Sequence, residues 1–301
     1  MKIFITGSNG LLGQKLIANI QKLTPDVKII AASKGVNRLT SLVGFKYYDL
    51  DISNESEVLQ VVEKECPDVI INSAAMTNVD QCEDHKDSCW DVNVHAVKYL
   101  VEACEKINSH FIQLSTDFIF DGENGPYKEN DLANPLSYYG ESKLASEQIV
   151  MDAKCSWAIV RTVLVYGVGE NLGRTNIVLW AIEALGKNQG MNVVDDQFRT
   201  PTLAEDLAIG CLSIARHKKE GVYNVSGKDY MSILELVQRV GAFFSFKTNH
   251  INVISSSTLN QAAKRPPVTG FVLHKAKSEL GYTPMSFEEG LEVVQSQIDL
   301  S

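Results

Sequence analysis

The stretch Met1-Lys2-Ile3-Phe4-Ile5-Thr6-Gly7-Ser8-Asn9-Gly10-Leu11-Leu12-Gly13 decides the fold. Its first residues form a short apolar run typical of a buried parallel strand, and the pattern over residues 11–23 predicts an amphipathic helix. Between them, the glycines fit a GxxGxxG loop, in which the backbone turns tightly and approaches a pyrophosphate at the helix N-terminus. We therefore predict a dinucleotide site formed by Gly7, Ser8, Asn9, Gly10, Leu11, Leu12 and Gly13.

The same alternation of strand and helix continues through the first 165 residues. Apolar runs predict strands at 27–32, 46–50, 69–74, 111–115 and 158–165, and amphipathic patterns predict helices at 55–65, 88–107 and 138–152. Repeated units of this kind form a parallel sheet with helices on both faces, so we expect an α/β fold with a Rossmann-type doubly wound parallel sheet. Residues 1–165, with a return around 203–226, form the expected dinucleotide-binding domain. The remainder of 166–301 forms a smaller C-terminal α/β substrate-binding lobe.

Composition excludes several classes of protein. The 301 residues are 45% hydrophobic and 22% charged, and 28 Lys and Arg against 37 Asp and Glu give a formal net charge of −9. A chain with this charge and no basic cluster is repelled by a nucleic-acid backbone. No apolar run approaches the roughly 18 residues of a membrane span, and the first one is too short for a secretory signal. The scattered cysteines lack metal-ligand spacing, so we expect a cytoplasmic protein without nucleic-acid, membrane or metal partners.

The ends of the second and third strands carry the residues expected to select the cofactor. The second strand ends at Ser33 and Lys34, where folds selective for NAD usually have an acidic residue for the ribose 2′-hydroxyl. Because no acid stands there, Ser33 and Lys34, together with Arg38, suit a 2′-phosphate. We therefore expect NADPH, with NADH as the second choice. After the third strand, Asp51 and Ile52 are candidates to hold the adenine.

A tyrosine and a lysine four residues apart open the helix expected at 138–152. Tyr139 and Lys143 lie on one helical face, where an ammonium group beside a phenol would lower the phenol's pKa from about 10 and make it a proton donor near neutral pH. Upstream, Thr116 follows the strand at 111–115 and stands at the carboxyl end of a central strand, where open α/β sheets bind ligands. Thr116, Tyr139 and Lys143 are therefore expected to converge on one carbonyl group.

Together these features resemble the extended short-chain dehydrogenase/reductases over essentially the whole chain. Within that family the chain is most similar to the dTDP-4-dehydrorhamnose reductases. The resemblance is carried by residues 6–13, Asn72-Ser73-Ala74-Ala75-Met76-Thr77-Asn78-Val79-Asp80, Asn93, Ser115-Thr116-Asp117-Phe118-Ile119-Phe120-Asp121-Gly122, the Tyr139 and Lys143 pair, Arg161-Thr162, Val165-Tyr166-Gly167, Asp196-Gln197-Phe198-Arg199-Thr200-Pro201-Thr202 and Lys264-Arg265-Pro266.

The resemblance implies an oxidoreductase that uses NADPH to reduce the 4-keto group of a 6-deoxy sugar nucleotide, with dTDP-4-dehydrorhamnose giving dTDP-rhamnose. It implies that Tyr139 is the general acid, that Lys143 holds the nicotinamide ribose, and that Thr116 binds the substrate carbonyl. It is also compatible with a homodimer. The further residues that it implies are Ala74, Ala75 and Asn93 for the cofactor, Asn93 also serving a proton relay, and Thr77, Val79, Asp117, Phe118, Gln197 and Arg265 for the nucleotide sugar, with Arg265 suited to a diphosphate.

Two departures from the reductase pattern bear on the substrate, and two other functions stay open. Phe118 stands where these reductases commonly have Tyr, and Leu164 where many have Trp, which puts the sugar in doubt more than the hydride chemistry. A sugar-nucleotide epimerase or dehydratase would keep Tyr139 and Lys143 with a tightly held NAD, although dehydratases place Asp-Glu after the catalytic threonine. A non-catalytic regulatory subunit like that of methionine adenosyltransferase has a string similar to residues 115–122.

Overall fold

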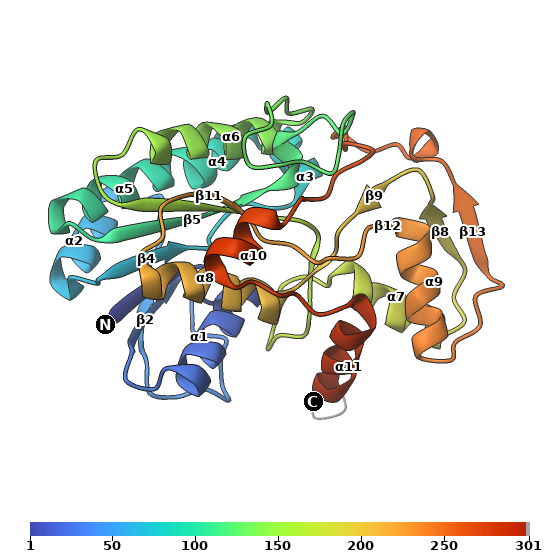
Figure 1. Ribbon diagram of the computed structural model, residues 1–301, viewed down its shortest axis with the longest axis horizontal. Coiled ribbons are helices and arrows are strands. Elements are labelled where there is room, and N and C mark those ends of the chain that lie inside the picture. The colour runs from blue at the N-terminus through green and yellow to red at the C-terminus, as the bar shows by residue number, and fades with distance from the viewer. Residues whose placement is uncertain (299–301) are drawn as a thin grey trace.

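The computed structural model describes residues 1–298, and its centre is a seven-stranded sheet. The strand order is β11-β6-β5-β4-β1-β2-β3, and neighbouring strands pair in parallel, so the chain starts in the middle and winds outward in both directions (Figure 1). The predicted doubly wound α/β fold is confirmed. The strands are β1 (Lys2–Thr6), β2 (Lys28–Ser33), β3 (Lys46–Asp49), β4 (Val69–Asn72), β5 (His110–Thr116), β6 (Trp157–Thr162) and β11 (Gly221–Asn224).

Helices cover both faces of this sheet. One face carries α1 (Leu11–Leu23), α8 (Ala204–His217) and α10 (His274–Leu280), and the other carries α2 (Glu55–Glu65), α5 (Ala96–Ile107) and α6 (Tyr138–Met151) (Figure 1). Successive side chains of a strand point to opposite faces, so Ile3 and Ile5 pack in the core beneath α1 and α8, while Phe4 packs beneath α2 and α5. The near-continuous apolar strands of the sequence are therefore strands buried on both faces.

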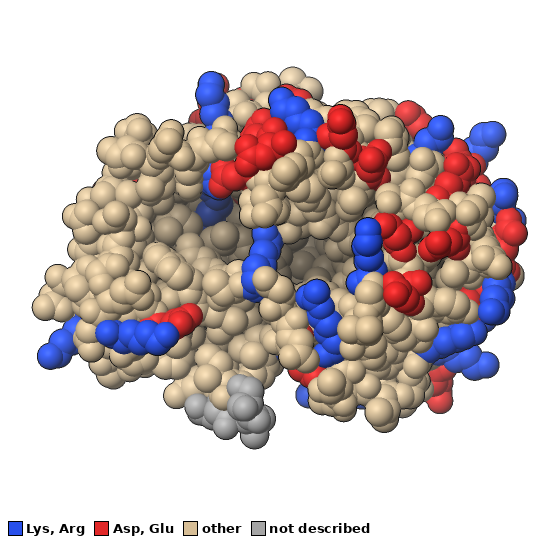
Figure 2. Space-filling model, turned by 180° about the vertical axis from the view of Figure 1, so that it is seen from behind, with Lys and Arg blue, Asp and Glu red and all other residues tan. Residues whose placement is uncertain are grey.

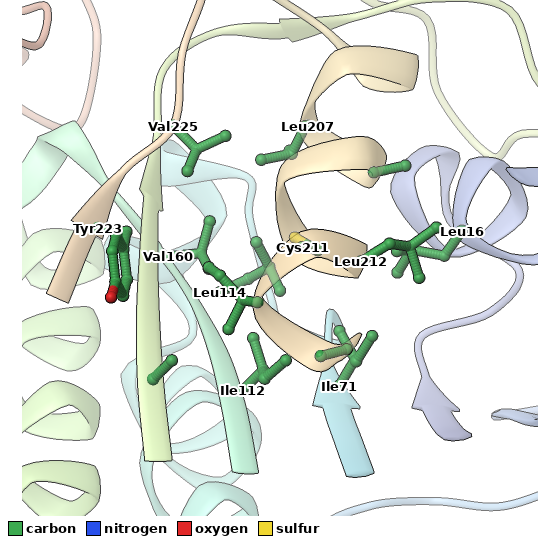
Figure 3. Packing of buried hydrophobic residues seen from close by; sticks show 14 of the residues in the cluster. Leu16, Ile71, Ile112, Leu114, Val160, Leu207, Cys211, Leu212, Tyr223 and Val225 are labelled. Carbon is green, nitrogen blue, oxygen red and sulfur yellow. The ribbon is translucent and has the colours of Figure 1, made fainter. Parts of the chain in front are cut away.

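Figure 3 shows how α8 lies between the sheet and α1. From α8, Leu207, Cys211 and Leu212 point toward side chains of the neighbouring strands and toward Leu16 of α1. The labelled strand-side partners are Ile71, Ile112, Leu114, Val160, Tyr223 and Val225. Residues 204–224 therefore return to the large sheet after the chain has left it, and α8 fixes the position of α1, whose N-terminus carries the glycine loop.

The smaller part of the molecule is built from short pairs of strands and three helices. Its core includes Tyr166, Leu236 and Leu291. We propose the division expected from the sequence, with residues 1–165 and 203–226 as one domain. The elements of the smaller part are α7 (Ile177–Gly186), α9 (Ile233–Phe243), α11 (Phe287–Ile298), β8 (Met191–Val194) with β13 (Ile251–Ile254), β7 (Val165–Tyr166) with β10 (Thr202–Leu203), and β9 (Phe198–Arg199) with β12 (Met231–Ser232).

The helix expected over residues 88–107 is divided. It begins earlier, as α4 (Lys86–Trp90), passes through a π-helical turn, η1 (Asp91–His95), and continues as α5. Such turns are rare and often lie near functional sites. The short helices α3 (Val79–Asp84), η2 (Asp117–Ile119) and η3 (Ser256–Thr258) complete the chain. Among residues 1–298, no helix combines the length and apolar character needed to cross a membrane.

Candidate active site

A cavity of about 800 Å³ opens at the carboxyl ends of the central strands, where ligands bind in open parallel sheets. Its walls come from the glycine loop, the ends of β4, β5 and β6, the first turns of α6, and residues 172–177 before α7. Seen from behind, the surface is hollowed in the middle of the molecule, with Lys and Arg side chains at the edges of the hollow (Figure 2). The volume is in the range of sites that bury a small ligand.

The glycine loop fits the pyrophosphate of a dinucleotide. A Cβ at Gly7 would lie 2.7 Å from the backbone N of Ala74, and one at Gly13 would lie 2.5 Å from the carbonyl O of Gly7, so side chains are excluded at both positions. Gly10 caps α1 without a side-chain hydrogen bond, and the first turn of α1 has no acidic residue. The loop therefore offers a phosphate an uncapped helix N-terminus at close backbone approach.

The cavity continues toward the end of β2, where cofactor selection is expected. Ser33 and Lys34 both line it, and the Ser33 hydroxyl accepts a hydrogen bond from the backbone N of Asn9 at 3.0 Å. The Lys34 ammonium donates to Asp51 Oδ2 at 2.6 Å, so its charge is already paired. Arg38, the second expected cation, also lines the cavity, and its guanidinium donates a long bond of 3.4 Å to the carbonyl of Asn171. Arg38 is therefore the better-placed group for a 2′-phosphate.

The structure brings the three expected catalytic residues to the same wall. Thr116 ends β5, while Tyr139 and Lys143 occupy the first turns of α6, which Ser137 caps by accepting from the backbone N of Gly140. All three residues are less than 9% exposed. The Lys143 ammonium donates to the carbonyl of Leu114 at 2.6 Å, which anchors α6 to β5 beside the cavity.

Electrostatics at this wall differ from the expectation that Lys143 lowers the pKa of Tyr139. Burial raises the pKa of Tyr139, and the Thr116 hydroxyl and the Arg174 charge oppose that rise only in part. Burial also lowers the pKa of Lys143 to about 8, against the opposing charge of Glu147. Burial is therefore the largest influence on both groups, and Tyr139 is a protonated phenol at neutral pH, the form that a proton donor requires.

Most of the residues expected to bind the nucleotide sugar also line the cavity, and two of them are already in ion pairs. Arg265 donates to Asp80 through two bonds of 2.6 and 3.2 Å. Asp117 is buried with Arg199 Nε at 3.8 Å; burial raises the pKa of Asp117 and the Arg199 charge opposes this. Lining residues from this set are Thr77, Val79, Thr116, Asp117, Phe118 and Arg265.

Both departures from the reductase pattern face the cavity. Phe118 packs edge-on against the ring of Tyr139, with 5.8 Å between centroids. Leu164 lines the cavity with φ at +41°, a backbone conformation that a bulky side chain rarely adopts. The two substitutions therefore change the shape of the wall beside the proton donor.

Five expected residues do not line the cavity, namely Ser8, Asp51, Ile52, Asn93 and Gln197. Asn93, in the π-helical turn, supports the wall from behind: its side chain bonds the backbone N and O of Met76 at 2.8 and 3.0 Å and donates to the Ser142 hydroxyl at 3.0 Å. It thereby ties the segment after β4 to α6. We keep its proton-relay role as a proposal.

Sequence reasoning missed Arg174 as a site residue and did not assign Arg199 to the site. Arg174 precedes α7 and donates to the Thr77 hydroxyl at 2.6 Å, across 97 positions of sequence. Arg199 donates to the carbonyls of Pro266, Pro267 and Phe198 and lies beneath Asp117. One sequence signal could have pointed to the region of Arg174. Asn176 is an N-cap residue that marks the start of α7, so the segment that contains Arg174 lies at a helix N-terminus.

Comparison with known proteins agrees with this geometry. The family model described as "RmlD substrate binding domain" matches residues 1–299. A dTDP-4-dehydrorhamnose reductase from Aggregatibacter actinomycetemcomitans is 30% identical, with 98% of each chain covered. A crystal structure of dTDP-4-dehydrorhamnose reductase from Bacillus anthracis in complex with NADP is 30% identical, covers 98% of this chain and 99% of that one, and superimposes with a TM-score of 0.84.

A relative of another kind also matches. The methionine adenosyltransferase 2 subunit beta of Bos taurus is 28% identical over 88% of this chain and 78% of its own length. The match of the family model to nearly the whole chain, together with the reductases at 30% identity, confirms the resemblance that the motifs indicated. The chain belongs to the RmlD substrate-binding-domain family of NAD(P)-dependent sugar-nucleotide reductases.

Proposed function

We propose that this protein uses NADPH to reduce the 4-keto group of a 6-deoxy sugar nucleotide, with dTDP-4-dehydrorhamnose as the first substrate to test. The observation that carries the proposal is one cavity lined by the glycine loop at one end and by Thr116, Tyr139 and Lys143 at the other. The relative from B. anthracis, whose crystal structure contains NADP, supports the choice of cofactor.

Each wall of the cavity has a role in this proposal. The glycine loop binds the cofactor's pyrophosphate, Ser33 and Arg38 bind its 2′-phosphate, and Lys143 holds its nicotinamide ribose. When bound, the cofactor supplies the hydride that forms the new C–H bond at C4. Remaining cofactor contacts are proposed for Ala74 and Ala75.

The chain's own residues handle the proton. Thr116 holds the carbonyl oxygen, and the Tyr139 phenol donates its proton to that oxygen, so that the ketone becomes a secondary alcohol. Oxidation of a bound cofactor would balance this reduction, and Tyr139 would then regain its proton from solvent. The buried wall around Tyr139 favours the neutral phenol before the reaction and so keeps it loaded with its proton.

The test is NADPH oxidation in the presence of dTDP-4-keto-6-deoxy-L-mannose generated in situ. We expect Tyr139→Phe to reduce kcat at least about 100-fold, the usual contribution of a general acid, while the Kd for NADPH stays within about twofold. The matched control is Tyr138→Phe, because Tyr138 is the neighbouring tyrosine, packs at a tilt against the ring of Trp90 and does not line the cavity. Turnover that survives Tyr139→Phe unchanged would contradict the proposed acid.

Similarity to the methionine adenosyltransferase subunit supports a second candidate, a nucleotide-binding regulatory subunit. If this second candidate is correct, the wild-type protein binds NADPH, none of the keto sugars tested leads to NADPH oxidation, and the protein co-purifies with a synthetase. An epimerase or dehydratase is distinguished by purified protein that carries NAD which added NADPH does not displace. These measurements separate the three functions without any change to the chain.

A further inference from the structure

Four arginines line the cavity: Arg38, Arg174, Arg199 and Arg265. Arg265 is held in two bonds by Asp80, and Arg199 is buried beside Asp117. Arg38 lies at the cofactor end, where its backbone N donates to Asn9 Oδ1 of the glycine loop. Within residues 1–298, Arg174 is therefore the cavity arginine on the substrate side that has no carboxylate partner.

Arg174 also has the right position for a group that meets the substrate. Its side chain is exposed and reaches from the segment before α7 to the hydroxyl of Thr77, which follows β4, so that its 2.6 Å bond joins two walls of the cavity. Its charge acts on the Tyr139 phenol and opposes the rise of that pKa. Arg174 thus lies between the expected nucleotide-sugar residues and the reacting end of the site.

We propose that Arg174, and not Arg265, binds the diphosphate of the nucleotide sugar, exchanging its bond to Thr77 for bonds to phosphate oxygens. The inference rests on the proposed function. A guanidinium binds phosphate in a planar two-bond geometry, and bonds between charged groups are about twice as strong as neutral ones. Arg174 would release only a neutral hydroxyl, whereas Arg265 would leave the carboxylate of Asp80 without its partner.

The experiment measures binding of dTDP and of UDP to the NADPH-saturated protein by titration calorimetry. We expect Arg174→Gln to raise the Kd for dTDP at least about tenfold and Arg174→Lys to restore part of the affinity, since a lysine keeps the charge but not the planar fork. Arg216→Gln is the matched control, because Arg216 is exposed at the end of α8 and does not line the cavity. The Kd for NADPH checks that each variant is folded.

The outcomes separate the inference from the function on which it rests. If Arg174→Gln binds dTDP as the wild type does, the inference is wrong while the reductase proposal stands. A variant with weaker NADPH binding and unchanged dTDP binding would assign Arg174 to the cofactor's pyrophosphate, which also overturns the inference. If the wild-type protein binds neither nucleoside diphosphate yet binds NADPH, both the inference and the proposed function fail.

Discussion

Lys143 is a charged side chain that is almost fully buried in the cavity wall. It is 3% exposed, and its ammonium donates to the Leu114 carbonyl while burial lowers its pKa to about 8. The protein therefore keeps a cation at the catalytic wall at neutral pH at the expense of folding stability. This loss of folding stability is tied to the proposed function, because the same ammonium is positioned to hold the nicotinamide ribose in the proposed reaction.

The buried ammonium gives the free energy of unfolding a defined pH dependence. Between the folded pKa of about 8 and the ordinary value of 10.5, the unfolded state binds more protons, so the wild-type free energy of unfolding rises with pH. We expect the wild type to gain stability relative to Lys143→Met over this window, by at most about 3 kcal/mol. Urea unfolding at pH 7, 8, 9 and 10 measures it, with the exposed Lys98→Met as control. A difference between the two proteins that stays constant or falls with pH would refute this account.

Candidate site residues could be predicted from the sequence where their residue type and spacing indicate a function. Tyr139 and Lys143 are candidates because their spacing of four residues puts them on one face of a helix. Gly7 and Gly13 are candidates because they lie between a strand and a helix. Arg174 meets Thr77 only because the segment before α7 lies in the same cavity wall as the residues that follow β4, and no local pattern reports a contact across 97 positions. The direction of the Tyr139 pKa shift was missed for a similar reason, since burial is a property of the packed wall.

At the scale of elements, α6 is fastened to β6 by a buried ion pair. Arg161 donates to Glu147 through Nη2 and Nε at 2.7 and 3.0 Å, and both side chains are at most 5% exposed. Glu147 lies one turn beyond Lys143 on the same face of α6. Arg161 also donates to the carbonyl of Glu129 at 2.9 Å, so the pair joins helix, strand and loop. The position of Tyr139 and Lys143 over the cavity depends on this junction.

We expect Glu147→Gln to lower the free energy of unfolding by about 3 kcal/mol, because it leaves the Arg161 guanidinium buried without its counter-charge. The single variants Glu147→Leu and Arg161→Met each leave one buried charge without its partner, whereas the double variant Glu147→Leu/Arg161→Met removes both charges and should lose less stability than either. Urea unfolding of these three variants and the wild type completes a double-mutant cycle, and Glu141→Gln, at an exposed position of α6, is the control. A Glu147→Gln protein as stable as the wild type would show that the junction is not held by this pair.

Element positions could be predicted more closely than element breaks. The helices expected at 11–23 and 55–65 and the first strand coincide with the structure, because apolar patterning marks all three and Asn54 also caps the second helix. The strand expected at 158–165 instead ends at Thr162, and Leu164 turns the chain at positive φ before β7. The helix expected at 88–107 contains a π-helical turn. The first break lies in the cavity wall and the second in the segment that packs behind that wall. At both places the local preference for a continuous strand or helix is overridden by the shape of the site.

At the scale of the whole molecule, a contact between distant segments holds the loop after β2, whose Arg38 lines the cofactor end of the cavity. The Glu170 carboxylate accepts from Thr40 N at 2.8 Å, from the Thr40 hydroxyl at 2.7 Å, and from the backbone and hydroxyl of Ser41. The Gln14 amide also bonds the backbone of Glu170 at both its N and its O, each at 2.8 Å. The loop after β2, which carries Arg38, is thereby fastened to α1 and to the segment that leads to Arg174.

Because the Glu170 carboxylate makes this contact, the attachment of the loop after β2 should be sensitive to acid. Although burial raises the pKa of the carboxyl, the hydrogen bonds from Ser41 and Thr40 outweigh it and lower the pKa to about 2. A lowered pKa stabilises the folded state above the ordinary value of 4.5, and this stabilisation is lost as the pH falls from there toward 2. We expect Glu170→Ala to lower Tm at pH 7 and to raise the Kd for NADPH, because the loop that carries Arg38 loses its fastening.

The decisive measurement is the Tm difference between wild type and Glu170→Ala as a function of pH. It should be largest at pH 7 and shrink steadily between pH 4.5 and 3, because the unfolded carboxyl takes up a proton in that range while the folded one stays ionised. Glu292→Ala, at an exposed position of α11, should leave both Tm and NADPH affinity unchanged. If the difference persists undiminished at pH 3, the loop is held by its backbone packing and not by the carboxylate. Hydrogen exchange of residues 37–43 at pH 7 then gives an independent reading, since a loop released from Glu170 exchanges faster in the variant.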